Sequence, residues 1–537
     1  MPKIVKGFGP MDAKLIVIGE APGETEEQLS RPFMGAGGRF LRAKLSNVGI
    51  NHEQVRYENL MEYRPPQNKF EFFLQGEKYV ELQARVEELK ALIKTINPNV
   101  VLCVGQQPLR FLMDKTSIGD WRGHFIWSQE CDCKMIATYH PSACLRQRNV
   151  HKSQKPGQYE ALFQADIAKV GRELGTKELK IPQYSLLVNP SFDEAMNEME
   201  QLRTNAQILS FDIETVENRL TCIGFSATTN RACCIPVYNV QEGKLVTHWD
   251  ESQAKAIWEQ IIALVESDIP KVLQNSQYDI TVLEHYYGIK TRNLYWDTLV
   301  AAHNLYCDLP KDLGTLISLY TNMPYHKYMI EAGSNLAYWE YNALDALTTL
   351  MIMQEERKEL IEFKTLNHFL NVTMPLIPCL IKMQLTGVNV DLRLRDRAID
   401  REDRYMTDII EALHQVLPGF NPRSPMQCGK LFYDTLHCPV IRSKGKPTIG
   451  ADALERIAER DERPYVKLLT DVVTKFRMSG HMAGVLRTPL LAGRMHTAYD
   501  AGGTDTGRLN SKESIFGTGT NLQNLQQGPQ RQMLVPG

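Results

Sequence analysis

Two acidic residues stand one position apart at the end of an apolar run, in the segment Ser-Phe-Asp-Ile-Glu-Thr at 210–215. Side chains of a strand alternate between its two faces, so Asp212 and Glu214 should project to the same side. Neighbouring carboxylates repel each other unless a cation lies between them, and such hard oxygen ligands suit Mg²⁺ or Mn²⁺. The pair therefore predicts a metal site, and a half-exposed strand with an acidic face is the alternative.

Three later segments favour the metal interpretation. Asp279 follows the apolar run at 272–273, where a second strand would give way to a helix. Tyr341 and Asp345 are four residues apart in a long helical pattern, which places them on one helix face. Between these segments, residues 296–303 have the pattern of another helix start.

This ordered set resembles the proofreading 3′→5′ exonucleases over roughly residues 186–364. In that family four acidic residues hold two metal ions, Mg²⁺ or Mn²⁺, and the resemblance assigns this role to Asp212, Glu214, Asp279 and Asp345. It implies that Tyr341 orients the attacking water. It also implies that Asn275 and Tyr278 contact the 3′-terminal nucleotide of DNA. The alternatives are that Asn275 caps a helix and that Tyr278 belongs to the core.

The region before this one, residues 14–174, alternates strand and helix patterns. Such alternation implies an α/β domain with a mainly parallel sheet, and ligands of these sheets bind outside the carboxyl ends of the strands. Glu20 directly follows one predicted strand, and His140 follows another. We therefore expect a binding site where these two loops meet.

The same loops resemble the uracil-DNA glycosylase superfamily, in particular its iron–sulfur branch. The matching stretches are Gly-Glu-Ala-Pro-Gly at 19–23, Arg-Pro-Phe at 31–33, the segment 59–68 with Arg-Pro-Pro at 64–66, and His-Pro-Ser at 140–142. A flipped base needs an aromatic platform, a polar group that reads its edge and a donor near the leaving anion. The resemblance assigns stacking to Phe33, uracil recognition to Asn59, charge stabilisation to His140, and action on the water to Glu20 or Glu26.

One departure from the iron–sulfur branch affects the cofactor. That branch holds its cluster with four cysteines, but here Tyr63 occupies one of those positions and no cysteine precedes Cys103. We therefore expect no iron–sulfur cluster. Two interpretations stay open for the domain: it excises uracil, or it only binds DNA or senses uracil.

Residues beyond 363 resemble the polymerase part of family A DNA polymerases. The matching stretches are 382–391, the thumb-like motif at 420–427, Thr-Asp-Thr-Gly-Arg-Leu-Asn-Ser at 504–511 and Gly-Thr-Asn-Leu-Gln-Asn-Leu at 519–525. In the family the last two loops grip the primer–template near the palm. The resemblance implies that Arg508 contacts phosphate and that Gln523 and Asn524 lie along the primer–template duplex.

The sequence ends at Gly537, before the palm and fingers motifs of that family. Without the palm carboxylates, the two ions of nucleotidyl transfer lack ligands, so we expect no polymerisation by this chain alone. A truncated polymerase and a polymerase divided over two genes both explain this ending. An open sheet edge and exposed apolar surface would be costly, which favours a second polypeptide that carries palm and fingers.

Composition adds few constraints. A chain of 537 residues predicts three to four domains, and a net charge of −2 argues neither for nor against a locally basic DNA groove. The 11 cysteines follow no framework, which predicts free thiols in a reducing compartment. The N-terminus lacks an apolar signal core and no run reaches transmembrane length, so we expect a cytoplasmic protein with no membrane partner.

Taken together, the sequence predicts an α/β multidomain protein. The expected parts are a uracil-DNA-glycosylase-like α/β domain at 1–174, a linker at 175–184, a ribonuclease-H-like exonuclease domain at 185–365, and a mostly helical thumb with a partial palm at 366–537. The expected function is proofreading in DNA replication or repair, on single-stranded 3′ ends and primer–template DNA. The alternatives are a non-catalytic DNA-binding accessory subunit and a uracil excision enzyme with an attached nuclease.

Overall fold

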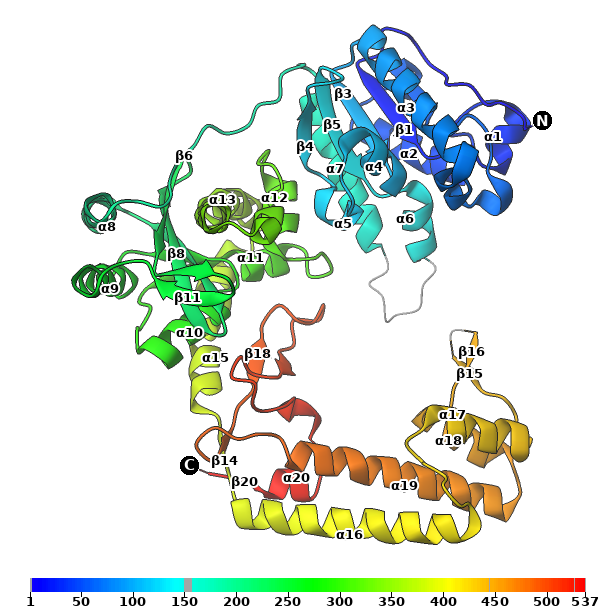
Figure 1. Cartoon of the computed structure of the whole chain (residues 1–537), viewed down its shortest axis with the longest axis vertical. Helices are drawn as coiled ribbons and strands as arrows, with labels where there is room; N and C mark the ends of the chain where they lie inside the picture. The colour runs from blue at the N-terminus through cyan, green and yellow to red at the C-terminus, as the bar shows by residue number, and fades with distance from the viewer. Residues whose placement is uncertain (1, 149–156, 444, 526, 537) are drawn as a thin grey trace. The chain divides into compact units, whose positions relative to one another are not determined.

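The computed structural model describes all residues except 1, 149–156, 444, 526 and 537 (Figure 1). The chain divides into two compact units. The first comprises Met1–Pro378 with Asp505–Gly507, and the second comprises Cys379–Thr504 with Arg508–Gly537. The domain limits expected within these units stay predictions.

The first unit opens with a five-stranded sheet in the order β2-β1-β3-β5-β4. Its strands are β1 (Leu15–Gly19), β2 (Val55–Asn59), β3 (Val100–Val104), β4 (Phe125–Ser128) and β5 (Cys133–Thr138). All neighbours run parallel except β4, which pairs antiparallel with β5. β1, β3 and β5 are buried along their whole length, as expected for apolar strands of a sheet that is covered on both faces.

Helices cover both faces of this sheet (Figure 1). They are α1 (Glu24–Leu29), α2 (Ala36–Asn47), α3 (Gly76–Ile96), α4 (Gln106–Met113), α5 (Ile118–Trp121), α6 (Pro141–Arg148) and α7 (Gln158–Glu173), with 3₁₀ turns at His52–Gln54, Pro66–Asn68 and Phe70–Leu74. Because strand side chains alternate, Ile16 and Ile18 share a core with α3 and α4, and Leu15 and Val17 share another with α2 and α7. The predicted α/β domain with a mainly parallel sheet is confirmed.

A six-stranded mixed sheet follows, in the order β13-β12-β7-β8-β9-β6. Its strands are β6 (Ser185–Leu187), β7 (Leu209–Val216), β8 (Arg219–Thr228), β9 (Arg231–Pro236), β12 (Lys271–Leu273) and β13 (Leu294–Asp297). β7, β8 and β9 are antiparallel, and β12 joins β7 in parallel. A hairpin of β10 (Tyr238–Gln241) and β11 (Lys244–Thr247) extends from β9.

In the part of the chain that the structure describes, seven helical segments accompany this sheet, and the longest of them, α13, carries several of the polar residues of the candidate site. They are α8 (Phe192–Asn205), α9 (Glu251–Val265), α10 (Ser276–Tyr287), α11 (Thr298–Leu305), α12 (Leu313–Tyr320), a 3₁₀ helix at Lys327–Ala332, and α13 (Asn335–Glu362). Buried apolar side chains of α13, among them Leu344 and Leu347, pack with Cys222 of β8 and Cys234 of β9.

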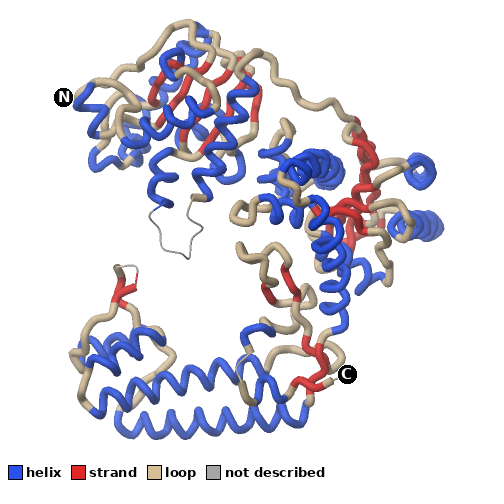
Figure 2. Tube along the Cα trace, turned by 180° about the vertical axis from the view of Figure 1, so that it is seen from behind, coloured by secondary structure: helices blue, strands red, loops and turns tan. Residues whose placement is uncertain are grey.

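The second unit is mostly helical, as predicted (Figure 2). Its helices are α16 (Leu392–Val416), α17 (Pro425–Gly429), a π-helical turn at Lys430–Thr435, α18 (Ala451–Arg460), α19 (Pro464–Leu486) and α20 (Pro529–Gln532). Its short strands are β14 (Val388–Val390), β15 (Arg442–Ser443), β16 (Lys446–Pro447), β17 (Arg494–Met495), β18 (Ala498–Asp500), β19 (Asn510–Lys512) and β20 (Leu534–Val535).

The chain passes from the first unit to the second through an apolar helical stretch. It comprises α14 (Leu366–His368), a π-helical turn (Phe369–Thr373) and α15 (Met374–Thr386). Among the described residues, this stretch (Leu366–Thr386) is long and apolar enough to cross a membrane by length and composition alone, so the expectation that no run reaches transmembrane length is wrong. A core helix of a soluble protein meets the same criterion, so the observation is weak evidence, and the cytoplasmic location stays a prediction.

Candidate functional site

The carboxylates of β7 lie on one face of the strand, as the alternation in the sequence predicted. Asp212 and Glu214 are half-buried, and the intervening Phe211 and Ile213 are buried. Asp345 of α13 joins the pair: Asp212, Glu214 and Asp345 each offer one oxygen, and these atoms all lie within 4.8 Å of one another. We call these three residues the carboxylate trio.

The approach of α13 to the sheet depends on a residue with no side chain. Gly224 of β8 pairs with Asp212, and a Cβ at Gly224 would lie 2.6 Å from the backbone oxygen of Asn342. The close contact lets Asn342 donate its side-chain amide to Asp212 Oδ2 at 2.8 Å and to Asp212 O at 3.1 Å. One turn further along α13, Asp345 reaches the other two carboxylates.

Asp279, the fourth acidic residue, lies outside the trio but contacts the strand that carries Asp212 and Glu214. It lies in the first turn of α10, and its Oδ1 accepts a hydrogen bond from Ile213 N, at 3.1 Å. Asp297 anchors the start of that helix, because its carboxylate accepts from Ser276 N at 2.7 Å and caps α11. The sequence pointed to a helix start near residue 297 but not to this bracing role.

Burial and mutual repulsion raise the pKa values of three of the acidic residues, Asp212, Glu214 and Asp279. Burial, followed by the charges of Asp279, Asp345 and Glu214, holds the pKa of Asp212 well above its ordinary value. Burial raises the pKa of Glu214 and of Asp279 to about 8. Such groups retain protons at neutral pH unless a cation replaces them, and hard carboxylate oxygens are the ligands that Mg²⁺ prefers. The donor set therefore fits a divalent cation.

Three polar residues near the trio were not singled out from the sequence. Tyr338 donates its hydroxyl to Glu214 Oε2 at 3.3 Å, and its spacing of three from Tyr341 could have suggested a shared helix face. Asn342 holds Asp212, as described above. His326 Nε2 lies 2.8 Å from Asp345 Oδ1 and comes from a loop with no periodic signal.

The structure places the other residues predicted for the exonuclease as follows. Tyr341 is half-buried, and burial beside Asp345 raises its pKa above the usual range, so its hydroxyl stays protonated. Tyr278 is half-buried, with its hydroxyl 2.7 Å from Thr215 Oγ1. Asn275 is exposed at the start of α10 with φ 60°, and among the described residues its side chain makes no capping hydrogen bond.

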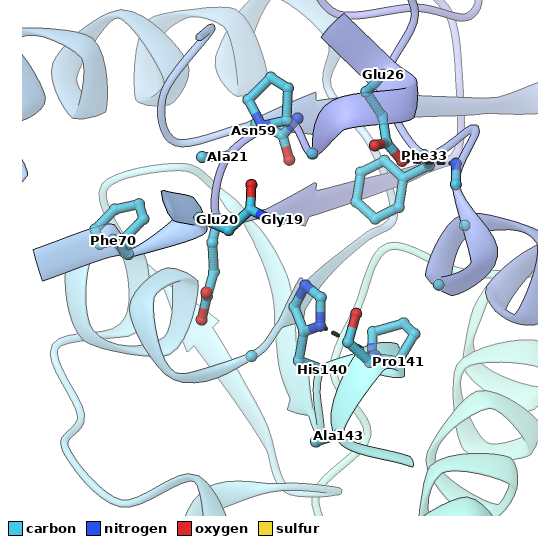
Figure 3. Close-up of a pocket in the computed structure, with 18 of the residues that line it drawn as sticks. Gly19, Glu20, Ala21, Glu26, Phe33, Asn59, Phe70, His140, Pro141 and Ala143 are labelled. Atoms are coloured by element: carbon cyan, nitrogen blue, oxygen red, sulfur yellow. Dashed lines mark hydrogen bonds between the residues drawn. The ribbon is translucent and has the colours of Figure 1, made fainter. Parts of the chain in front are cut away.

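A second polar pocket, of about 690 Å³, lies at the carboxyl ends of the first sheet. Its lining includes all five of the residues predicted for it: Glu20 after β1, Glu26 in α1, Phe33 after α1, Asn59 at the end of β2, and His140 after β5. Figure 3 shows these side chains around one opening, with Glu26 beside Phe33. The expected meeting of loops at this edge of the sheet is therefore observed.

Two glycines allow Phe33 and Asn59 to come together. A Cβ at Gly19 would lie 2.6 Å from Asn59 Oδ1 and 2.8 Å from Phe33 Cζ, and a Cβ at Gly38 would overlap Phe33 O. Phe33 itself has φ 57°, and its backbone oxygen accepts from Arg42. A non-glycine residue rarely adopts that backbone conformation, so the surrounding loop holds the ring in place.

The two glutamates of this pocket have different partners. Glu26 Oε1 accepts a hydrogen bond from Gly35 N at 2.7 Å and so braces the loop that carries Phe33. Glu20 makes a longer contact, 3.4 Å from Gln107 N, and burial raises the pKa of its carboxyl group. Glu20 is therefore the glutamate whose carboxylate is freer to act on a water molecule.

His140 is neutral at physiological pH. Its pKa is lowered to about 4, mainly by burial and to a lesser extent by the charge of Arg146. Its Nδ1 accepts from Ser142 N at 3.1 Å, as Figure 3 shows, so the single proton of the neutral ring is on Nε2. His140 can then donate a hydrogen bond from Nε2.

Tyr63 and the cysteines near it do not fit the ligand set of an iron–sulfur cluster. The Tyr63 ring packs edge-on against Phe73 with centroids 5.1 Å apart, and its hydroxyl bonds to Glu81 at 2.9 Å and to Lys78 at 2.9 Å. The nearby thiols lie in the apolar core, where burial raises the pKa of Cys103, Cys131 and Cys133. Cluster ligation needs thiolates, so this core opposes it.

In the second unit, Arg508, Gln523 and Asn524 are all exposed. Gln523 accepts from Ser511 N at 3.1 Å and donates to Leu509 O at 3.0 Å. Its amide thus braces the loop that carries Arg508, and its contact with DNA stays a prediction.

Two family models match the chain. The uracil DNA glycosylase superfamily matches residues 6–165. The 3′-5′ exonuclease family of the family A DNA polymerases matches residues 188–361. The first match contains the 690 Å³ pocket, and the second contains the carboxylate trio.

Individual relatives agree with these matches. A type-4 uracil-DNA glycosylase of Archaeoglobus fulgidus is 30% identical over 189 residues, which are 34% of this chain and 86% of that protein. A DNA polymerase of Bacillus phage SP01 is 23% identical over an alignment of length 628. That alignment covers 95% of this chain and 63% of that protein. DNA polymerase I of Pseudomonas aeruginosa is 25% identical over 395 residues, 67% of this chain and 41% of that protein.

The three relatives are covered to different extents. The chain spans most of the glycosylase, but less than two thirds of the phage polymerase and less than half of polymerase I. The phage alignment runs through nearly the whole of this chain. Through residues 6–165 the chain belongs to the uracil DNA glycosylase superfamily, and it is a homologue of the family A DNA polymerases with a 3′-5′ exonuclease domain.

Proposed function

We propose that residues 188–361 remove nucleotides from the 3′ end of DNA with two bound Mg²⁺ or Mn²⁺ ions. The observation that carries this proposal is the convergence of the carboxylate trio, whose oxygens lie within 4.8 Å of one another. Such ions, when bound, activate water near neutral pH and stabilise charge on the leaving 3′ oxygen. Asp212, Glu214 and Asp345 would bind them, and Asp279 would complete the set.

The neighbouring tyrosines and asparagine would keep these ligands and the water in place. The hydroxyl group of Tyr341 stays protonated. It can therefore donate a hydrogen bond to a carboxylate of the trio or accept one from the attacking water. Tyr338 and Asn342 hold Glu214 and Asp212 in a fixed orientation. Asn275 and Tyr278, on the first turn of α10, would contact the terminal nucleotide of a single-stranded 3′ end.

The test is degradation of 5′-labelled single-stranded DNA by the full chain. We expect stepwise shortening from the 3′ end with Mg²⁺ or Mn²⁺, and loss of most of the rate in Asp212→Ala and Glu214→Ala. Glu259→Ala, on the exposed surface of α9, is the matched control and should retain the rate. A wild-type preparation that leaves the DNA intact with either metal would favour a non-catalytic DNA-binding accessory subunit.

For residues 6–165 we propose excision of uracil from DNA. The pocket supports this, because it combines a ring platform, a buried amide and a neutral histidine donor around one opening. Phe33 would stack on the flipped base and Asn59 would read its polar edge. Glu20 would accept a hydrogen bond from the water that attacks the sugar C1′.

The proposed reaction breaks the bond between uracil N1 and the sugar C1′ and forms a bond from C1′ to the water oxygen. The uracil ring leaves with the bonding electron pair, and the proton of the water passes to Glu20. The Nε2 proton of His140 would stabilise the negative charge on the departing base. The reaction requires no metal ion, which separates it from the exonuclease.

The corresponding test is the release of free uracil from DNA in the presence of a metal chelator. We expect alkali-sensitive abasic sites with the wild-type chain, and their loss with Asn59→Ala or His140→Ala. Binding of uracil-containing DNA without release would show that the domain senses uracil only.

The second unit would contribute contacts to primer–template DNA through Arg508 and through the loop that carries Gln523 and Asn524. We propose that the chain acts in DNA replication or repair together with a second polypeptide that supplies polymerase palm and fingers. Purification of the chain from its native source, followed by identification of the associated proteins, tests this partner. Recovery of the chain without a polymerase subunit would contradict it.

A further inference from the structure

The glycosylase domain and the exonuclease domain meet within the first unit at a buried polar contact. Lys169 of α7 is 3% exposed, and its Nζ donates to Gly123 O at 2.8 Å within its own domain. The same Nζ donates to Ser318 O at 3.0 Å and to Thr321 O at 2.6 Å, both in the exonuclease domain. The three protons of the ammonium group thus bind three carbonyl oxygens across the interface.

A buried ion pair supports this contact from the glycosylase side. Arg122 Nε donates to Asp166 Oδ2 at 3.0 Å, and Thr138 donates to the same oxygen at 2.7 Å. Arg122 Nη1 then reaches Ser318 Oγ at 2.9 Å. A buried charged group that is hydrogen-bonded on all sides has one low-energy geometry, so this contact holds the Ser318 region in place.

Aromatic and apolar contacts continue along the same exonuclease segment. His124 Nδ1 lies 3.2 Å from Met323 O, and Met323 is fully buried. The Tyr325 ring packs against Trp121 with centroids 5.0 Å apart and against His124 at 5.6 Å. Residues 318–325, which we call the docking segment, therefore pack on the glycosylase domain over their length.

The residue that follows the docking segment reaches the exonuclease site. His326 is buried, its Nδ1 lies 3.2 Å from Pro324 O, and its Nε2 lies 2.8 Å from Asp345 Oδ1. Its ring is also 5.8 Å from the Tyr341 ring. One peptide bond thus joins Tyr325, whose side chain packs on the glycosylase domain, to His326, whose side chain contacts a member of the carboxylate trio.

We propose that the glycosylase domain positions the exonuclease site through the docking segment, with His326 as a positioning residue for Asp345. The inference rests on the proposed metal-dependent exonuclease. Outer contacts that orient a metal ligand change metal affinity and rate, typically by about 10- to 100-fold when they are lost. Loosening the contact on the glycosylase side should therefore weaken metal binding at the exonuclease site, although no glycosylase residue touches DNA or metal there.

The test compares two lysines of the glycosylase domain in the full chain. Lys169→Met removes the hydrogen bonds to Ser318 and Thr321, and Lys44→Met removes the ion pair with Glu160 within the same domain. We expect Lys169→Met and His326→Gln each to raise the Mg²⁺ concentration for half-maximal exonuclease rate by about 10-fold and to lower kcat, with little change in KM for DNA. Lys44→Met should resemble wild type.

The double variant tests whether both residues act along one route. If they do, Lys169→Met adds little to His326→Gln, whereas independent effects would multiply. Equal effects of Lys169→Met and Lys44→Met, or multiplying effects in the double variant, would overturn the proposal. If Lys169→Met does not fold, Tyr325→Leu replaces it, because it removes the ring contacts with Trp121 and His124 and leaves Lys169 in place.

A second readout keeps this inference separate from the exonuclease proposal. Mn²⁺ binding to each variant is measured by calorimetry without DNA. If wild type binds Mn²⁺ but leaves DNA intact, the exonuclease proposal fails while the positioning role is still judged by the affinities. A weaker Mn²⁺ affinity in Lys169→Met than in Lys44→Met supports that role, and equal affinities contradict it.

Discussion

Asn342 of α13 donates its side-chain amide to Asp212 Oδ2 of β7 at 2.8 Å. A Cβ at Gly224 would lie only 2.6 Å from the backbone oxygen of Asn342. The helix and the sheet therefore approach each other as closely as a glycine permits. The same approach brings Asp345 to the carboxylates of β7.

Gly224→Ala should push α13 away from β7. Crowding of this kind costs about 1–3 kcal/mol in the free energy of unfolding, and the displaced Asp345 should reduce the exonuclease rate as well. Urea unfolding and degradation of single-stranded DNA measure the two effects. Gly175→Ala, where a Cβ would meet nothing within 4 Å, is the control, and an unaffected rate in Gly224→Ala would contradict the prediction.

Mg²⁺ should stabilise the chain more at pH 8 than at pH 6. The folded-state pKa values of Glu214 and Asp279 are raised to about 8, so from their ordinary values of 4.5 and 3.8 up to about pH 8 the folded state binds more protons than the unfolded state. The stability of the metal-free chain therefore falls as the pH rises through this window. Metal binding displaces these protons, so its contribution grows with pH.

Thermal unfolding with and without Mg²⁺ at the two pH values measures this difference. The double variant Asp212→Asn with Glu214→Gln removes two of the titrating groups, and its response to Mg²⁺ should be small at both pH values. An equal Mg²⁺ effect at pH 6 and pH 8 in wild type would count against metal binding by the trio.

Uracil release should not depend on the titration of His140 between pH 5 and pH 8. Burial lowers the folded-state pKa of His140 to about 4, below its ordinary value of 6.5, so between about pH 4 and pH 6.5 the unfolded state binds more protons than the folded state. The contribution of His140 to stability is therefore lost as the pH falls from about 6.5 to about 4. Single-turnover rates across this range, with unfolding measured in parallel, test both statements. A rate that falls with an apparent pKa near 6.5 in wild type, and not in His140→Asn, would contradict them.

The two glutamates of the pocket should differ in what their substitution changes. Glu20→Gln should abolish most uracil release, because an amide cannot accept the proton of the attacking water. Glu26→Ala should cost about 1 kcal/mol of stability through the lost bond to Gly35 N, with a smaller effect on the rate. Single-turnover uracil release and thermal unfolding separate the roles, and the reverse pattern would assign the water to Glu26.

Tyr63 and Phe73 should stabilise the region that holds a cluster in the iron–sulfur branch. Phe73 is fully buried, so Phe73→Ala should cost about 3–5 kcal/mol. Tyr63→Phe, which loses the bonds to Glu81 and Lys78, should cost about 1 kcal/mol. Chemical unfolding measures both, and iron analysis of protein purified without oxygen should find less than one iron atom per chain. Stoichiometric iron would contradict this account.

The sequence by itself determined the local geometry of both sites. Alternation along β7 places Asp212 and Glu214 on one face, and helix spacing does the same for Tyr341 and Asp345, because these relations follow from backbone repeats of a few residues. The alternating strands and helices of the first domain likewise predicted a pocket at the carboxyl ends of its sheet. Such relations involve neighbours along the chain, so they can be read without knowing the fold.

Only the tertiary structure decided which residues hold the site together. Asn342 and Asp212 are 130 positions apart, and Lys169 and Thr321 are 152 apart, so no local pattern relates them. Their contacts arise because buried apolar faces pack in one arrangement and polar groups enclosed by that packing must find partners there. The same reason explains why the sequence left Glu20 and Glu26 as alternatives, and why it gave no indication of His326.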